Sequence, residues 1–275
     1  MLFAIGSPLP DYRIRASTGS LTSTNRIHDD EYARRCGYRG ALVPGTSIYS
    51  YMARSLAELL GRDWLERGSA EVRFELPAYE GEEIRISGSV RSMTQEGVLW
   101  IDCQAKNSKG ETCAEGTASL PRESPGAPPD LDGYPAGKHK PLRSITLQSL
   151  RIGENLIPVK SEFTRQTHWA YCQKIIRDHH PFFQELIHPG WLLSQPGIIL
   201  AANFDLPAWI HVASAIRHYH AQAEECVVET RGWVSDKFEQ KGDHYLVLDL
   251  ALFAGERCLQ TITHTVIFRI APRAA

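Results

Sequence analysis

The chain has 275 residues, of which 43% are hydrophobic, and it carries 30 Lys and Arg against 32 Asp and Glu. This length allows one large domain or two of ordinary size, and the hydrophobic content suffices to build cores in either case. Because the charge nearly balances and no basic block appears along the chain, nucleic acid or an anionic membrane is not expected as the main partner.

Cysteine usage and hydropathy indicate the compartment. The six cysteines are scattered and no two form a CxxC pair, so we expect free thiols in a reducing environment. The N-terminus shows no basic leader before an apolar core, and no apolar run approaches the roughly 20 residues that a membrane span needs. The sequence therefore predicts a soluble, cytoplasmic protein.

In chain order, the first predicted elements are a short strand within residues 5–18, an irregular segment and a helix over residues 45–61. The helix sequence GTSIYSYMARSLAELLG is apolar enough for burial on most of its faces. Strands are expected within residues 70–90 and 97–120, where alternating apolar and β-branched residues end at Gly-containing turns such as NSKGE. One helix followed by several strands is therefore expected in this part of the chain.

The next segment separates two packed units. Residues 121–143 contain six prolines and no periodic apolar pattern, which is typical of an extended linker. The sequence thus predicts an N-terminal domain over residues 1–120 and a C-terminal domain over residues 144–275.

The second domain repeats the first. The sequence IGENLIPVKSEFT from Ile152 resembles IGSPLPDYRIRAST from Ile5, and HPGWLLSQPGIILAANF from His188 resembles VPGTSIYSYMARSLAELLG from Val43. The offset is about 145 residues, and the later strands align at almost the same offset, which indicates a duplication. Pro196 inside the second helix predicts a kink or a late first turn.

A long helix in each copy is covered most simply by an antiparallel sheet wrapped around it. That arrangement is the hotdog fold. The predicted class is therefore α+β, with two tandem hotdog units whose sheets lie side by side as an intramolecular pseudo-dimer.

Residues 23–45, STNRIHDDEYARRCGYRGALVPG, resemble the motif of the MaoC-like hydratase and dehydratase superfamily. Asn25 matches the motif asparagine, His28 the motif histidine and Gly45 the glycine that opens the helix. Ser23 stands where the family has its catalytic aspartate, and Pro44 replaces a second histidine.

The second copy departs from the motif in the opposite way. In IRDHHPFFQELIHPG, Asp178 falls on the aspartate, His180 on the asparagine and Phe183 on the histidine, while His188 and Gly190 lie close to the His-Gly pair of the family. One copy keeps the histidine and the other keeps the aspartate.

The resemblance implies a chemistry that needs no metal or organic cofactor. In the family, a backbone N–H at the helix N-terminus polarises the thioester carbonyl, for which Gly45 and Gly190 are the candidates here. The aspartate and histidine hold a water for reversible addition to a 2-enoyl thioester. By this resemblance His28 is the general base, Asn25 fixes the loop or the water, and Ser23 offers a hydrogen bond.

Several candidate residues also have structural interpretations. Asp29 or Asp30 either replaces the lost carboxylate or caps the short helix DEYARRCG, and we favour capping. Asp178 either belongs to a site or stabilises a turn before Pro181. His211 either lines a pocket or packs near the core, and Pro44, His180 and His188 are further candidates for substrate contacts.

Three functions follow from this. The first is an acyl-thioester hydratase or dehydratase centred on His28, and the second is a hotdog thioesterase in which Asp178 activates water. The third is a catalytically degenerate acyl-CoA-binding protein, because neither copy keeps the pair. The expected partner is an acyl-CoA or acyl-carrier thioester, and the double unit is a candidate for a homodimer.

Overall fold

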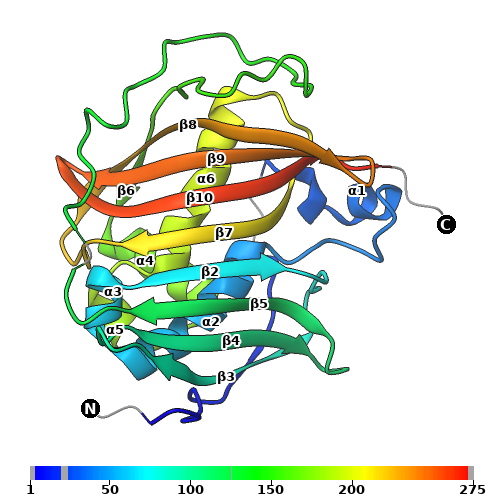
Figure 1. The fold of residues 1–275 in the computed structure, drawn as a ribbon. Coiled ribbons are helices and arrows are strands. Elements are labelled where there is room, and N and C mark those ends of the chain that lie inside the picture. Colours follow the sequence, from blue (N-terminus) through cyan, green and yellow to red (C-terminus); the bar gives the residue numbers. More distant parts are fainter. Residues whose placement is uncertain (1–3, 20–23, 125, 272–275) are drawn as a thin grey trace.

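The computed structural model describes residues 4–19, 24–124 and 126–271, which form a single sheet of ten antiparallel strands with the helices packed against it (Figure 1). The first half contributes β1 (Tyr12–Arg15), β2 (Ser69–Phe74), β3 (Glu83–Met93), β4 (Leu99–Asn107) and β5 (Thr112–Leu120). The second half contributes β6 (Val159–Phe163), β7 (Ile210–His218), β8 (Cys226–Gln240), β9 (Asp243–Ala254) and β10 (Arg257–Arg269).

The strand order shows the duplication directly. It runs β1-β3-β4-β5-β2 from one edge and β6-β8-β9-β10-β7 from the other, so each strand of the first half has a counterpart five strands later. The two halves meet at the centre, where β2 pairs antiparallel with β7 from Ser69 opposite Arg217 to Arg73 opposite Ala213. This arrangement confirms the predicted pair of hotdog units with their sheets side by side.

The α-helices of the described residues are α1 (Asp30–Arg35), α2 (Gly45–Leu60), α3 (Arg62–Arg67), α4 (Arg165–Ala170), α5 (Phe182–Glu185) and α6 (Pro189–Asn203). A 3₁₀ turn, η1 (Arg26–His28), and a π-helical turn, η2 (Tyr171–Ile175), complete the helical elements of this part of the chain. The two long ones, α2 and α6, contact each other and lie on the same face of the sheet (Figure 1). Eleven of the sixteen residues of α2 are buried, which confirms the expectation of burial on most faces.

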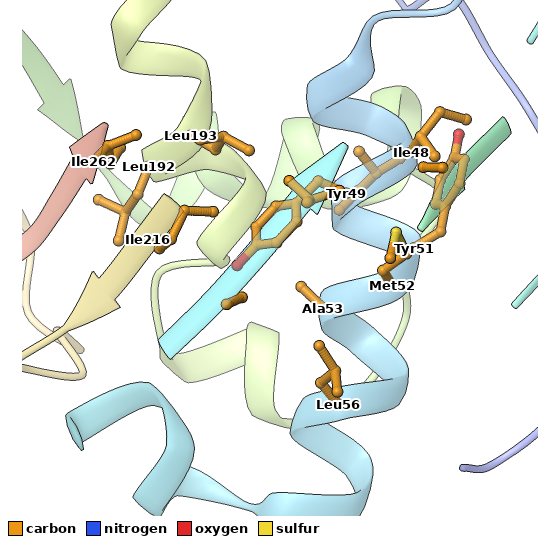
Figure 2. Packing of buried hydrophobic residues seen from close by; sticks show 14 of the residues in the cluster. Ile48, Tyr49, Tyr51, Met52, Ala53, Leu56, Leu192, Leu193, Ile216 and Ile262 are labelled. Atoms are coloured by element: carbon orange, nitrogen blue, oxygen red, sulfur yellow. The ribbon is translucent and has the colours of Figure 1, made fainter. Parts of the chain in front are cut away.

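The space between the two helices and the sheet is filled by large apolar side chains (Figure 2). Tyr49 and Met52 of α2 and Leu193 of α6 are each no more than 2% exposed. Burying one such side chain stabilises the fold by roughly 1.5–3 kcal/mol. Both helices therefore belong to one continuous core rather than to two separate ones.

A pair of strand glycines marks the equivalence of the halves at atomic detail. A Cβ on Gly88 of β3 would lie 2.0 Å from the carbonyl oxygen of Asp102, and a Cβ on Gly232 of β8 would lie 2.1 Å from that of Asp249. Their residue numbers differ by 144, close to the offset of the sequence repeat. Both copies thus bring neighbouring strands too close for a side chain at this point.

The second long helix begins well before Pro196, the residue at which a late first turn was one of the two expectations. Helix α6 starts at Pro189, so Pro196 lies inside the helix and does not mark a late first turn. Because proline has no N–H, it leaves the carbonyl of Leu192 without its intrahelical donor. The late-start alternative was wrong because Pro189 itself occupies the first turn, where proline is tolerated.

The segment between β5 and β6 passes over the outside of the second half (Figure 1). The hydroxyl of Tyr134 donates to Asp249 Oδ1 at 3.0 Å, and its ring packs against Trp233 at 4.8 Å between centroids. Arg143 forms two hydrogen bonds to the Glu154 carboxylate. This segment is therefore anchored on β8 and β9.

Cutting this segment tests how the halves hold together. A protease site inserted between Gly126 and Ala127 should yield two fragments that still co-elute in size-exclusion chromatography, because the β2–β7 ladder and the α2–α6 contact do not depend on the connection. Uncut protein is the control. Separate elution of the two fragments would show that covalent connection, and not packing, keeps the halves together.

Candidate functional site

A cavity of about 950 Å³ lies at the N-terminal end of α2, between the two halves. The first half contributes His28, Gly45 and Phe74 to its wall, and the second half contributes His211 and His264. One side is formed by α6, through Leu193, Ser194, Gly197, Ile198 and Ala201. The wall thus combines apolar side chains, mostly from α6, with polar groups from both halves, and such a combination can hold a small molecule.

His28 lines this cavity, and its two ring nitrogens have different partners. Its Nδ1 lies 2.7 Å from the carbonyl oxygen of Leu42, so Nδ1–H donates and the neutral ring carries its lone pair on Nε2. Burial lowers the pKa of His28 below its usual value, against the opposing effect of the Leu42 carbonyl. At neutral pH the residue is therefore an uncharged base.

Asn25 joins the motif loop to the other half of the chain. Its Nδ2–H donates to the carbonyl oxygen of Trp209 at 2.9 Å, and its Oδ1 accepts from the Trp209 N–H at 3.0 Å. The same oxygen caps the 3₁₀ turn over Arg26–His28 by accepting from Ile27 N–H at 3.3 Å. Nδ2 also lies 3.5 Å from His28 Nε2. Asn25 thus fixes the loop that carries His28 against the start of β7.

The start of α2 is open to the cavity. Its N-cap is Pro44, which provides no side-chain hydrogen bond to the first turn. A Cβ on Gly45 would lie 3.0 Å from His211 Nδ1 and 3.2 Å from the Phe74 ring, so a side chain there would narrow the cavity. Uncapped N–H groups and the positive end of the helix dipole favour an oxygen that develops negative charge.

The corresponding residues of the second copy form a buried network. His188 Nε2–H donates to Asp178 Oδ2 at 3.3 Å, and His188 Nδ1 accepts from the Gly190 N–H at 3.0 Å. Asp178 Oδ1 lies 3.2 Å from Arg54 Nε and accepts from the His180 N–H at 2.8 Å. The turn interpretation of Asp178 therefore describes only Oδ1, which accepts from the His180 N–H and also pairs with Arg54. Oδ2 accepts from the His188 ring.

The charges of this network balance inside the protein. Burial alone would raise the pKa of Asp178, but the bond from His188, the His180 N–H and the nearby Arg54 hold that pKa below its usual value. Burial lowers the pKa of His188 despite its contact with Asp178. Asp178 is therefore an ionised structural acceptor whose lone pairs are occupied.

The N-terminal end of α6 is closed by α2. A Cβ on Gly190 would lie 1.7 Å from Ser50 Oγ and 2.8 Å from the Tyr171 hydroxyl, which bond each other at 2.9 Å. A thioester carbonyl has no space at this position, and the Gly190 N–H already donates to His188. The two helix N-termini are equivalent in the sequence repeat but differ in access.

The structure thus divides the site residues expected from the sequence into two groups. His28, Asn25, Pro44, Gly45 and His211 line the cavity. Asp178, His180, His188 and Gly190 lie in the buried network, none of them among the residues that line the cavity. Ser23 lies outside the described residues.

The neighbouring aspartates serve the local fold. Asp29 caps α1 by accepting from the Tyr32 N–H at 2.8 Å. Asp30 accepts from the Ala41 N–H at 2.7 Å and pairs with Arg34. The capping interpretation is confirmed for Asp29, and Asp30 closes the loop that follows α1.

Sequence reasoning did not single out Ser214 and His264, which lie beside His211 in the structure. Ser214 Oγ lies 2.8 Å from His211 Nε2 and 3.0 Å from His264 Nδ1. The sequence offered only a weak indication of them, because each is a single polar residue at an inward-facing position of a strand. Only the pairing of β7 with β10, which sets Ser214 opposite His264, makes them neighbours.

Within residues 4–19, 24–124 and 126–271, no group of three or more His, Cys, Asp or Glu side chains is placed to hold a metal ion. No helix in that part of the chain has the length and apolar character of a membrane span.

Comparison with known proteins identifies the fold. The sequence matches no protein-family model and no curated protein. Among solved structures, a MaoC domain protein dehydratase from Chloroflexus aurantiacus J-10-fl superimposes with a TM-score of 0.67 at 12% identity, covering 98% of this chain and 96% of that one. A conserved Mycobacterium tuberculosis protein described as having a double hotdog fold gives a TM-score of 0.61 at 13% identity, covering 96% of each chain.

The chain has the double hotdog fold. The resemblance of its sequence to the MaoC-like superfamily is thereby confirmed at the level of the fold. A structure named as an oleoyl thioesterase from Lactobacillus plantarum also superimposes, with a TM-score of 0.58 at 8% identity over 99% of both chains. Because structures that superimpose on this chain are named for different activities, the fold alone does not determine its chemistry.

The closed end of α6 predicts a contrast between two glycines of that helix. Gly190→Ala should lower the free energy of unfolding by about 1–3 kcal/mol, because its Cβ would overlap Ser50. Gly197→Ala is the matched control, since its Cβ would only touch Trp209 at 3.7 Å and alanine favours a helix. Urea unfolding curves measure both, and equal stability of the two variants would contradict the tight packing at Gly190.

Buried histidines predict a loss of stability in acid. Burial lowers the pKa values of His168, His218 and His264 to about 3, below the unfolded value of about 6.5. The unfolded chain therefore binds more protons, and stability present above pH 6.5 is lost as the pH falls toward 3, by up to about 1.4 kcal/mol per pH unit for each histidine.

Urea unfolding between pH 7.5 and 5 checks this slope. His218→Phe should reduce the pH dependence, whereas a substitution of the exposed His139, such as His139→Gln, should leave it unchanged. A stability that does not change over this pH range would contradict the burial of neutral histidines.

Proposed function

We propose that this protein is an acyl-thioester hydratase or dehydratase that adds water reversibly to a 2-enoyl thioester, most simply an acyl-CoA, at one active centre. The observation that carries the proposal is the cavity that His28 shares with the uncapped start of α2. The equivalent end of α6 is closed by Ser50 and Tyr171. One base and one site for the carbonyl therefore meet in one place.

Binding of the thioester follows from the helix start. A thioester oxygen placed at Gly45 would receive backbone N–H donors of the first turn and the favourable field of the α2 dipole. Glycine at this position leaves room for the carbonyl beside His211 and Phe74. The acyl chain would then run along the apolar side of α6, past Leu193 and Ile198.

The proton chemistry needs a neutral base beside the double bond. As the water oxygen bonds to the β-carbon, His28 Nε2 takes one water proton and the π electrons move to the thioester oxygen. The His28 imidazolium then returns a proton to the α-carbon, which gives the 3-hydroxyacyl thioester. The Leu42 carbonyl stabilises the transient imidazolium through Nδ1–H. Dehydration is the reverse of these steps.

The walls of the cavity suit a substrate with a polar end and an apolar end. The β8–β9 hairpin contributes Phe238, Lys241 and Tyr245, and its lysine supplies a positive charge for phosphate groups. The stacked rings of Phe238 and Tyr245 lie 4.6 Å apart. We therefore place the pantetheine and phosphate part toward this hairpin and the acyl part along α6.

A catalytically silent acyl-thioester-binding protein is the second candidate, because Ser23 occupies the aspartate position of the motif. A thioesterase that uses Asp178 finds less support, since both oxygens of that carboxylate are engaged in the buried network. These candidates differ in what they release from an enoyl thioester.

The test uses purified protein with crotonyl-CoA and longer 2-enoyl-CoA thioesters, following enoyl absorbance and free thiol together. We expect absorbance to fall without thiol release, and His28→Ala to lower kcat by roughly 10²–10⁴, the range for removal of a general base. Thiol release would identify a thioesterase, and binding without turnover would identify a silent protein.

The fall of kcat/KM at acid pH tests whether His28 is the general base. Because burial lowers the pKa of His28, its neutral form should persist below pH 6.5, and kcat/KM should fall only at lower pH. His139→Ala, on the exposed segment between the halves, should leave both kcat and this profile unchanged. A fully active His28→Ala enzyme would rule out the assigned base.

A further inference from the structure

Three polar side chains at the back of the cavity have no part in the mechanism above. His211 Nε2 lies 2.8 Å from Ser214 Oγ, and Ser214 Oγ lies 3.0 Å from His264 Nδ1. Ser214 and His264 are buried, and the two histidine rings lie 4.2 Å apart. Both histidines line the cavity. A chain of hydrogen bonds from His264 through Ser214 to His211 therefore runs along the face of the sheet beside the cavity.

The other nitrogen of His211 has no partner. Within the described residues, His211 Nδ1 is buried and forms no hydrogen bond. It lies 3.0 Å from the position of a Cβ on Gly45, and the Phe74 ring packs against the imidazole at 4.5 Å. Leaving a buried polar atom without a hydrogen-bond partner costs free energy. A bound water or substrate group at the start of α2 would remove this cost.

His28 and His211 approach the same helix end from different halves. The carbonyl that holds His28 belongs to Leu42, three residues before Gly45. Asn25, which caps the His28 turn, bonds both backbone groups of Trp209, two residues before His211. The same asparagine thus fixes both histidines around the opening of α2.

We propose that His211 is a second catalytic residue of this cavity, whose Nδ1 accepts a hydrogen bond from the water that His28 activates. It fulfils the role that the family resemblance assigns to the aspartate replaced by Ser23. Ser214 and His264 are positioning residues that determine which nitrogen of His211 carries the hydrogen. This inference rests on the proposed hydratase function.

The direction of the hydrogen-bond chain follows from the helix end. The first-turn N–H groups and the positive end of the α2 dipole favour a lone pair on His211 Nδ1 over a further N–H. His211 Nε2–H then donates to Ser214 Oγ, and the Ser214 hydroxyl donates to His264 Nδ1. Burial, and the proximity of His264, lower the pKa of His211 against the opposing effect of the Ala213 backbone, so the ring stays neutral.

The step balances with one water and no other reactant. The water oxygen forms a covalent bond to the β-carbon and transfers one proton to His28 Nε2. Its second hydrogen stays on the oxygen and is hydrogen-bonded to His211 Nδ1. The proton on His28 goes to the α-carbon. His211 is neutral throughout, so its contribution is to orient the water, which two acceptors hold more narrowly than one.

Kinetics of three variants test this role. His211→Phe, which keeps the ring size but has no acceptor, should lower kcat on crotonyl-CoA at least 100-fold with KM changed less than threefold. His211→Asn, whose Oδ1 supplies an acceptor near Nδ1, should recover at least tenfold of that loss. Ser214→Ala should lower kcat about tenfold, because without the Ser214 hydroxyl the His211 ring is no longer held in the tautomer that carries its hydrogen on Nε2.

The matched control is His218→Phe. His218 is buried on the same strand, also has one ring nitrogen without a partner, and does not line the cavity. We expect its kcat to remain within twofold of the unmodified protein. If His211→Phe is as active as His218→Phe while His28→Ala is inactive, the inference about His211 is wrong and the hydratase function stands.

A spectroscopic measurement removes the dependence on turnover. Nitrogen-15 NMR of protein labelled at histidine should show His211 with hydrogen on Nε2 and a bare Nδ1, and Ser214→Ala should disturb that pattern. A hydrogen on Nδ1 would overturn the proposed acceptor. If the unmodified protein hydrates no enoyl thioester, the hydratase function and the catalytic role of His211 both fail.

Discussion

The pairing of β2 with β7 is the interaction on which the rest of the structure depends. Five residue pairs, from Ser69 with Arg217 to Arg73 with Ala213, join two five-stranded half-sheets into one. Because the half-sheets continue each other, α2 and α6 lie on one face and contact each other. The cavity at the start of α2 exists only because the second half supplies β7, β10 and α6 as its walls.

The duplicated architecture offers two equivalent helix ends, and side-chain packing distinguishes them. At α6, His188 satisfies the Gly190 N–H and α2 brings Ser50 against the glycine, so the end is closed. At α2, Pro44 offers no cap and Gly45 faces a cavity. The ionised Asp178 lies with the closed end, where Arg54 compensates its charge and the neutral His188 ring donates a hydrogen bond. Structural stability and ligand access are thus divided between the copies.

Burial has opposite consequences for the histidines of the two ends. His188 loses both ring nitrogens to protein partners and can only support the fold. His28 donates Nδ1–H to the Leu42 carbonyl, while its Nε2 has only the long 3.5 Å contact with Asn25 Nδ2, and the residue lines the cavity. The same desolvation that lowers both pKa values therefore gives a structural cap in one copy and an available base in the other.

The sequence by itself determined the duplication, the two long helices and the place of His28 and Gly45, because periodicity, the repeat offset and the motif are local patterns along the chain. It could not decide which copy is open, since His188 and Gly190 look as suitable as Pro44 and Gly45 when only spacing is read. The tertiary structure decided which copy is open, because Ser50 of α2 packs against Gly190 and closes the start of α6. It also joined His211 with Ser214 and His264, because strand register between β7 and β10, and not sequence distance, sets which side chains meet.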